Sequence, residues 1–103
     1  MKKLLLASSL IGLLAASAVV QSAEQAVVDR YSKTCAVCHT AGVANAPKTG
    51  DVEAWAARMD KGMDALVVSV DKGLNAMPPK GMCFDCSADD FKALIEYMSK
   101  PKK

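Results

Sequence analysis

Two cysteines and a histidine stand close together in the stretch Cys35-Ala36-Val37-Cys38-His39. The pattern C-x-x-C-H is typical of covalent haem attachment, in which each thiol adds to one of the two vinyl groups of the porphyrin. The imidazole after the second thiol can reach the iron from a short helical turn and serve as its proximal ligand. His39 is the only histidine of the chain. Cys35, Cys38 and His39 are therefore predicted to hold one haem c; the alternatives are a chance motif or half of a structural zinc site.

A methionine on a stiff loop is the predicted sixth ligand of the iron. Met77 is followed by Pro78 and Pro79, and proline lacks an N–H and biases the residue before it toward extended geometry, so Met77 cannot lie inside a helix. A thioether held in this way favours reduced iron and suits an electron carrier. The alternative is that Met77 is only a packing residue. Met59 and Met63 fall at helical spacing and are predicted to be core residues rather than ligands.

A second cysteine pair, Cys83 and Cys86, is followed by Ser87 rather than by histidine, so it is not a second haem site. C-x-x-C is also the dithiol signature of redox enzymes, but those enzymes place it in a strand-helix-strand unit, and no strand pattern is visible here. We therefore favour an internal disulfide and keep the redox dithiol as the alternative. A zinc site built from all four cysteines is disfavoured, because the segment between the two pairs is much longer than in paired-cysteine zinc sites.

The N-terminal residues 1–23 have the order of a secretory signal. Lys2 and Lys3 precede an apolar run from Leu4 to Val20 that ends among small residues, which predicts cleavage and export to the periplasm. An uncleaved signal would instead tether the same domain to the membrane. Residues 24–103 then form one domain. Because Lys2 and Lys3 account for the formal net charge of +2, this domain has no net charge, which argues against a nucleic acid partner.

Four helices are predicted for residues 24–103. A short helix over 24–34 leads into the haem motif, and three amphipathic helices follow, because apolar residues recur at i, i+3, i+4 and i+7. Asp51 is a predicted N-cap, and Ser87 with Asp90 forms a capping-box pattern. The three apolar stripes are Val52, Trp55, Ala56 and Met59; Met63, Leu66, Val67, Val70 and Leu74; and Phe91, Leu94, Ile95 and Met98.

Residues 40–50 are predicted to form a loop, because Gly42, Pro47 and Gly50 break any regular period. A backbone carbonyl of Ala46-Pro47 is our candidate acceptor for the second ring N–H of His39, which would fix the tautomer of the imidazole. Trp55 is predicted to be a core residue whose indole N–H needs a partner, and a haem propionate would serve.

Together these motifs resemble the small class I cytochromes c, specifically the cytochrome c5 family, over about residues 24–100. The resemblance implies an all-α class I cytochrome c fold of about four short helices around one covalently bound haem, with the first and last helices crossing beside it. It further implies His39 and Met77 as axial ligands and a Cys83–Cys86 disulfide. The family commonly has two glycines before the first disulfide cysteine, where this chain has Gly81-Met82; only the local loop geometry is thereby in doubt.

The resemblance implies a one-electron carrier between respiratory complexes, which is not an enzyme. We expect a monomer that meets its redox partners transiently and meets membranes only through membrane-bound partners or an uncleaved signal. A haem enzyme or gas sensor with a displaceable sixth ligand is the alternative; it usually needs a distal His or Arg, and Arg30 and Arg58 lie on predicted helices with no motif that places them there. The predicted docking patch is small and mostly apolar: Ala41, Val43, Ala44, Lys80 and Met82.

Overall fold

The computed structural model describes the backbone of residues 11–102 and the side chains of residues 22–102. Its helices are α1 (Ile11–Lys33), α2 (Ala36–His39), α3 (Val52–Met59), α4 (Met63–Lys72) and α5 (Ala88–Ser99), with 3₁₀ turns at Val43–Asn45 and Pro79–Met82. Within these residues, β pairing is limited to one isolated bridge between Leu74 and Met77. The predicted all-α class is confirmed. The four predicted helices are present, and the fifth, α2, is the single turn that carries the haem motif.

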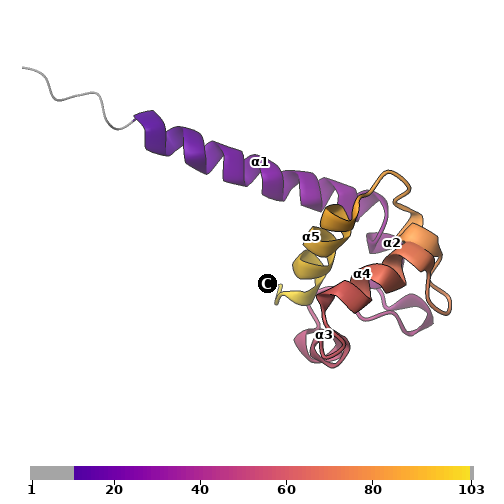
Figure 1. Cartoon of the computed structure of the whole chain (residues 1–103). Helices are drawn as coiled ribbons and strands as arrows, with labels where there is room; N and C mark the ends of the chain where they lie inside the picture. Colours follow the sequence, from indigo (N-terminus) through magenta and orange to yellow (C-terminus); the bar gives the residue numbers. More distant parts are fainter. Residues whose placement is uncertain (1–10, 103) are drawn as a thin grey trace, which may run out of the picture.

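Helix α1 is longer than the helix predicted over 24–34. It begins at Ile11 and continues without a break to Lys33, because no glycine or proline interrupts the alanine-rich sequence after Gly12. Its N-terminal half points away from the other helices (Figure 1), which gives the molecule its long dimension of 74 Å. The predicted signal begins in residues 1–10, which lie outside the described residues, and its cleavage stays a prediction. Among the described helices, none combines the length and hydropathy that a membrane span requires.

The predicted helix caps are present. The Asp51 carboxylate accepts a hydrogen bond from the backbone N–H of Ala54 at 3.2 Å, so α3 begins where the sequence indicated. At α5 the Ser87 hydroxyl accepts from the N–H of Asp90 at 3.1 Å, and the Asp90 carboxylate accepts from the N–H of Ser87 at 2.8 Å. These bonds satisfy N–H groups that a helix start leaves without partners.

The core lies where α5 meets the C-terminal end of α1, α3 and α4 (Figure 1). Helix α5 supplies most of it, because Phe91, Leu94, Ile95 and Met98 are all buried, as their spacing predicted. Two clusters form: one joins Phe91 and Leu94 to the second cysteine pair, and the other joins Ile95 and Met98 to Trp55. Cys35 packs against both clusters, so the haem motif is anchored in the core.

The other two stripes are buried less evenly. On α3 only Trp55 is buried, and Val52 and Ala56 are exposed, so the predicted stripe is wrong at these two positions. Residues of the α4 stripe pack partly buried against the clusters, and Met59 and Met63 do the same, in line with their predicted packing role. Leu74 lies beyond the end of α4 and is 49% exposed.

Candidate haem-binding site

The haem motif occupies the tight turn between α1 and α2. Helix α1 ends at Lys33, and α2 starts again at Ala36, with the N–H of His39 donating to the carbonyl of Cys35 at 2.9 Å. One helical turn thus carries both thiols and the imidazole, as predicted. Cys35 and Cys38 are free cysteines. Burial raises the pKa of the Cys35 thiol, although a hydrogen bond from Thr34 opposes this, so Cys35 is poorly suited to act as a catalytic thiolate.

The His39 side chain is buried, with 7% of its surface exposed. Its Nδ1 lies 2.7 Å from the backbone carbonyl oxygen of Pro47. A carbonyl can only accept, so Nδ1 carries the ring proton and Nε2 keeps its lone pair. This confirms the predicted acceptor in Ala46-Pro47. The imidazole is therefore held in the tautomer that can bind a metal through Nε2.

Trp55 packs beside this imidazole, with the two ring centroids 5.6 Å apart. It is buried, as predicted, but its indole N–H donates to the backbone carbonyl of Lys48 at 2.9 Å. The expected propionate partner is thus wrong for this N–H, because a protein acceptor already uses it. Sequence reasoning could not find this bond, since any residue at position 48 would offer the same carbonyl.

Met77 lies on a short turn directly after α4, outside any helix, as the two prolines predicted. Its backbone N–H and C=O both pair with Leu74, at 2.9 and 3.0 Å. Glycines flank this turn closely: a Cβ added to Gly73 would lie 3.0 Å from the Met77 carbonyl oxygen, and one added to Gly81 would lie 3.0 Å from the Met77 methyl carbon. The turn therefore has little room to move, and Met77 itself is partly buried.

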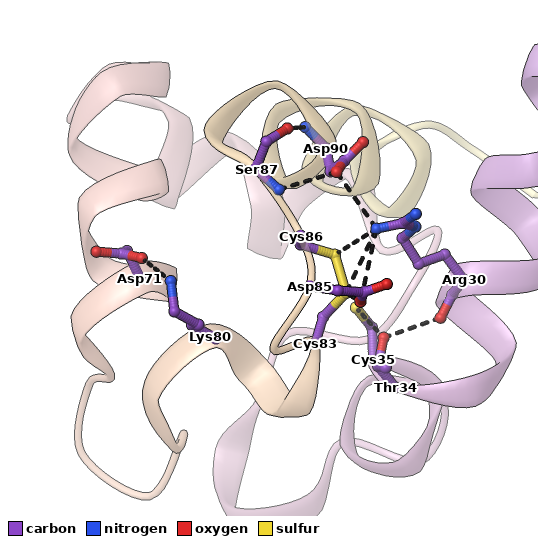
Figure 2. Close-up of a disulfide and its surroundings, with 10 residues drawn as sticks. All are labelled: Arg30, Thr34, Cys35, Asp71, Lys80, Cys83, Asp85, Cys86, Ser87 and Asp90. Atoms are coloured by element: carbon purple, nitrogen blue, oxygen red, sulfur yellow. Dashed lines mark hydrogen bonds and ion pairs between the residues drawn. A yellow bond between two sulfur atoms is a disulfide. The ribbon is translucent and has the colours of Figure 1, made fainter.

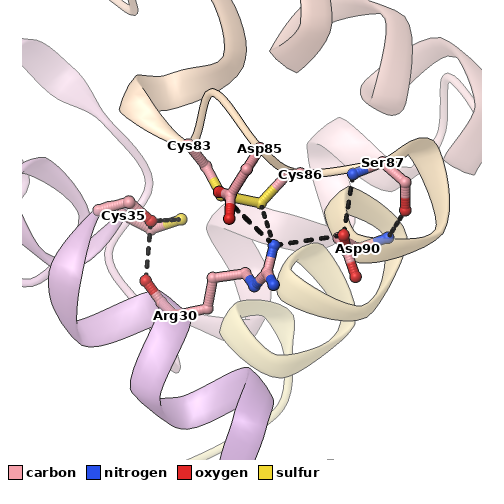
Figure 3. A network of polar contacts seen from close by, with 8 residues as sticks. Arg30, Cys35, Cys83, Asp85, Cys86, Ser87 and Asp90 are labelled. Atoms are coloured by element: carbon pink, nitrogen blue, oxygen red, sulfur yellow. Dashed lines mark hydrogen bonds and ion pairs between the residues drawn. A yellow bond between two sulfur atoms is a disulfide. The ribbon is translucent and has the colours of Figure 1, made fainter.

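Cys83 and Cys86 are joined by a disulfide that is buried in the core. Figure 2 shows that Arg30, from α1, points at this bridge. Its Nη1 lies 3.2 Å from the Cys86 sulfur and 3.3 Å from the Asp90 carboxylate. Figure 3 shows the same guanidinium linking α1 to the bridge and to the start of α5. Sequence reasoning placed Arg30 on a helix but missed this role, because its partners lie more than fifty residues away in the chain.

The predicted docking patch is mostly exposed. Ala41, Val43 and Ala44 are exposed, and so is Met82, with 56% of its surface in solvent. Lys80 is only partly exposed, and its ammonium lies 2.7 Å from the Asp71 carboxylate. Figure 2 shows this ion pair. Two apolar residues outside the predicted patch are more exposed than Met82. These are Val37, inside the haem motif and 72% exposed, and Phe84, between the disulfide cysteines and 70% exposed.

Comparison with known proteins identifies the family. The family model described as cytochrome C oxidase, cbb3-type, subunit III matches residues 22–98. Cytochrome c5 from Azotobacter vinelandii is 52% identical over 73 residues, which are 69% of this chain and 88% of the relative. Cytochrome c5 from Ectopseudomonas mendocina is 48% identical over 73 residues, covering 69% of this chain and 84% of the relative. The chain belongs to the cytochrome c5 family, within the group that this model describes.

Solved structures agree with this cytochrome c5 assignment. A mono-heme ferrocytochrome c from Shewanella putrefaciens is 55% identical, with a TM-score of 0.66 over 74% of this chain and 94% of that one. The cytochrome c fold was also matched in an electron transfer complex of nitrite reductase with cytochrome c, at 44% identity and a TM-score of 0.65 over 72% of this chain and 90% of the other. The predicted class I cytochrome c fold is confirmed.

As a c5-type cytochrome, the chain is an electron carrier with a covalently bound haem c. The residues present fit that group. Two thiols on one turn, a buried imidazole whose Nε2 is free of the Pro47 bond, and a thioether on a stiff turn form the donor set that c-type haem takes.

Proposed function

We propose that this cytochrome is a periplasmic one-electron carrier of the respiratory chain, with Cys35 and Cys38 in thioether bonds to the haem and His39 and Met77 as its axial ligands. The proposal includes a monomeric, non-enzymatic protein released from residues 1–23 by signal cleavage. The observation that carries it is the hydrogen bond from His39 Nδ1 to the Pro47 carbonyl at 2.7 Å. That bond leaves one ring nitrogen, Nε2, with a lone pair for iron.

Haem supplies the redox chemistry, because its iron alternates between the ferric and ferrous states. The residues of the chain hold and orient the groups that would bind the haem. The buried imidazole is fixed by the Pro47 carbonyl, and the Met77 turn is fixed by its own backbone bonds and by Gly73 and Gly81. With His39 and Met77 both bound, no coordination position would remain for a substrate, which favours a carrier over an enzyme.

The exposed apolar residues are suited to transient contact with other redox proteins. A complex of cytochrome c with nitrite reductase is known for a structural relative. We propose that this chain docks on its partners through the exposed apolar patch, since weak electron-transfer contacts bury small areas. Its members are Ala41, Val43, Ala44 and Met82, with Lys80 at the edge.

An absorption spectrum of the holoprotein with an intact mass tests this proposal. We expect a low-spin, six-coordinate spectrum in both redox states and no rapid binding of carbon monoxide by the ferrous protein. The mass should equal that of residues 24–103 plus one haem, less two hydrogens for the disulfide. A high-spin spectrum or fast carbon monoxide binding would instead favour the haem enzyme or gas sensor with a displaceable sixth ligand.

A further inference from the structure

The segment 47–50 is fixed to four different helices by four consecutive residues. One bond from each residue joins it to a different helix, and a further bond runs from the Thr49 N–H to the His39 carbonyl; all five are 2.7 to 2.9 Å long. The pairs are Pro47 with His39 of α2, Lys48 with Trp55 of α3, Thr49 with Tyr31 of α1, and Gly50 with Met98 of α5. A segment of irregular backbone is thereby tied to four of the five described helices.

Trp55 contacts both the segment 47–50 and the His39 imidazole. Its indole N–H donates to the carbonyl of Lys48, the residue directly after the one whose carbonyl accepts from His39. Its ring also packs beside the imidazole, 5.6 Å between centroids. Two neighbouring peptide carbonyls are therefore each held by a ring N–H. The Lys48 carbonyl also accepts from the backbone N–H of Asp51 at 3.0 Å. Only the Cα of Lys48 separates the two peptide units, so fixing the Lys48 carbonyl limits the positions open to the Pro47 carbonyl.

We propose that Trp55 is a positioning residue for electron transfer: by holding the Lys48 carbonyl, it keeps the Pro47 carbonyl aligned with His39 Nδ1–H. A well-aligned acceptor raises the basicity of the imidazole, and a more basic ligand stabilises ferric iron. Trp55 thus lowers the reduction potential without touching the iron. The inference rests on His39 as the proposed iron ligand.

Trp55→Phe in the full holoprotein is the direct test, because phenylalanine keeps an aromatic ring but has no N–H to donate. The Pro47–His39 bond should weaken, so the reduction potential should rise. At a fixed ambient potential the ferrous-to-ferric ratio should increase about threefold, a shift of about 30 mV, since tenfold is about 59 mV for one electron. The His39 Nδ1 proton should also exchange with solvent faster, as measured by NMR.

Ile95→Val is the matched control. Ile95 is 2% exposed and lies in the same cluster as Trp55, but its side chain has no polar atom and so donates no hydrogen bond to the segment 47–50. This variant should lower the unfolding midpoint while leaving the potential and the His39 proton exchange as in the wild type. Equal changes in potential in both variants would overturn the proposal, as would a Trp55→Phe protein with wild-type potential and exchange, because Trp55 would then be a packing residue alone.

A measurement on the wild type covers the case in which Trp55→Phe does not fold. The indole N–H of Trp55 and the Nδ1–H of His39 should both be strongly protected from exchange and should become exposed in the same opening event. Rapid exchange of the indole N–H beside a protected His39 proton would contradict the proposal. A failure of the proposed ligation itself would appear separately, as a wild-type spectrum without a low-spin haem.

Discussion

The segment that follows His39 is tied to four helices, whereas the Met77 turn is fixed mostly by residues next to it in the chain. His39 depends on the Pro47 carbonyl, and that carbonyl depends on distant partners such as Trp55. Met77 instead pairs with Leu74 three residues earlier and is flanked by Gly73 and Gly81. Substitutions in the core should therefore disturb the position of His39 more than that of Met77. The position of Met77 should respond mainly to changes within its own turn.

Met77→Ala should have the largest effect. Without the thioether the ferric protein should become largely high-spin, lose the weak charge-transfer band at the red edge of the visible spectrum, and bind carbon monoxide readily when reduced. The potential should fall by an appreciable part of the roughly 0.8 V range that haem axial ligands span. Absorption spectra and a potentiometric titration measure these changes.

Met59→Leu and Met63→Leu are the controls for that experiment. Both methionines pack against the Trp55 cluster, so these near volume-conserving changes should cost under about 1.5 kcal/mol each and leave the spectrum unchanged. An unaltered spectrum in Met77→Ala, or loss of the charge-transfer band in either control, would mean that Met77 is not the sixth ligand.

Gly73→Ala should have the next largest effect. Gly73 has φ 88° and ψ 156°, a region open almost only to glycine, so alanine should cost about 1–3 kcal/mol. The added Cβ would also lie 3.0 Å from the Met77 carbonyl oxygen and from the Pro79 nitrogen. We therefore expect a weakened charge-transfer band as well as a lower free energy of unfolding.

Gly62→Ala separates these two causes. Gly62 has nearly the same backbone conformation, φ 92° and ψ 147°, but a Cβ there would meet nothing within 4 Å. It should lose stability to a similar degree and keep the wild-type spectrum. If both variants keep the band unchanged, the Met77 turn does not depend on the close approach of Gly73.

Removal of the Cys83–Cys86 bridge should have a smaller effect. The bridge closes a short loop, so its contribution to stability should be about 1–2 kcal/mol. The bridge lies beyond the Met77 turn, and we expect the Cys83→Ala, Cys86→Ala double variant to melt at a lower temperature with an intact haem spectrum and normal electron transfer. Lost electron transfer with a normal spectrum would make the pair a working dithiol.

The smallest predicted effect concerns Asp90. The backbone N–H of Ser87 is the main cause that holds the pKa of the Asp90 carboxyl below its usual range, with Arg30 a lesser one. Because the folded-state pKa is the lower one, the stability it provides is present above about pH 4 and is lost as the pH falls through the folded-state pKa. The side chain is 39% exposed, so Asp90→Asn should cost only about 0.2–0.5 kcal/mol at neutral pH.

A pH series of denaturant unfolding measures this cost. The difference between Asp90→Asn and the wild type should shrink as the pH is lowered and the wild-type carboxyl takes up a proton. Neither protein should change its haem spectrum over the range in which both remain folded. A difference that grows toward acid pH would show that Asp90 does not stabilise the fold through its charge.

Sequence reasoning found the features that depend on neighbouring residues. The caps at Asp51 and Ser87 and the non-helical Met77 were predictable, because the residues that cause them lie within a few positions. The partners of Arg30 and of the Trp55 indole were not, since they depend on how α1 and α3 meet distant parts of the chain. The length of α1 was missed for another reason: the N-terminal residues were interpreted as a signal, although their composition also favours a helix.

The bonds of the segment 47–50 use main-chain atoms at all four positions, namely the carbonyls of Pro47 and Lys48 and the N–H groups of Thr49 and Gly50. Main-chain atoms are common to nearly all residue types, so side chains here can be exchanged over evolutionary time with little penalty. An inserted or deleted residue would instead shift every later peptide group onto the wrong helix. Among descendants of this gene, we expect the number of residues between His39 and Trp55 to persist longer than their identities.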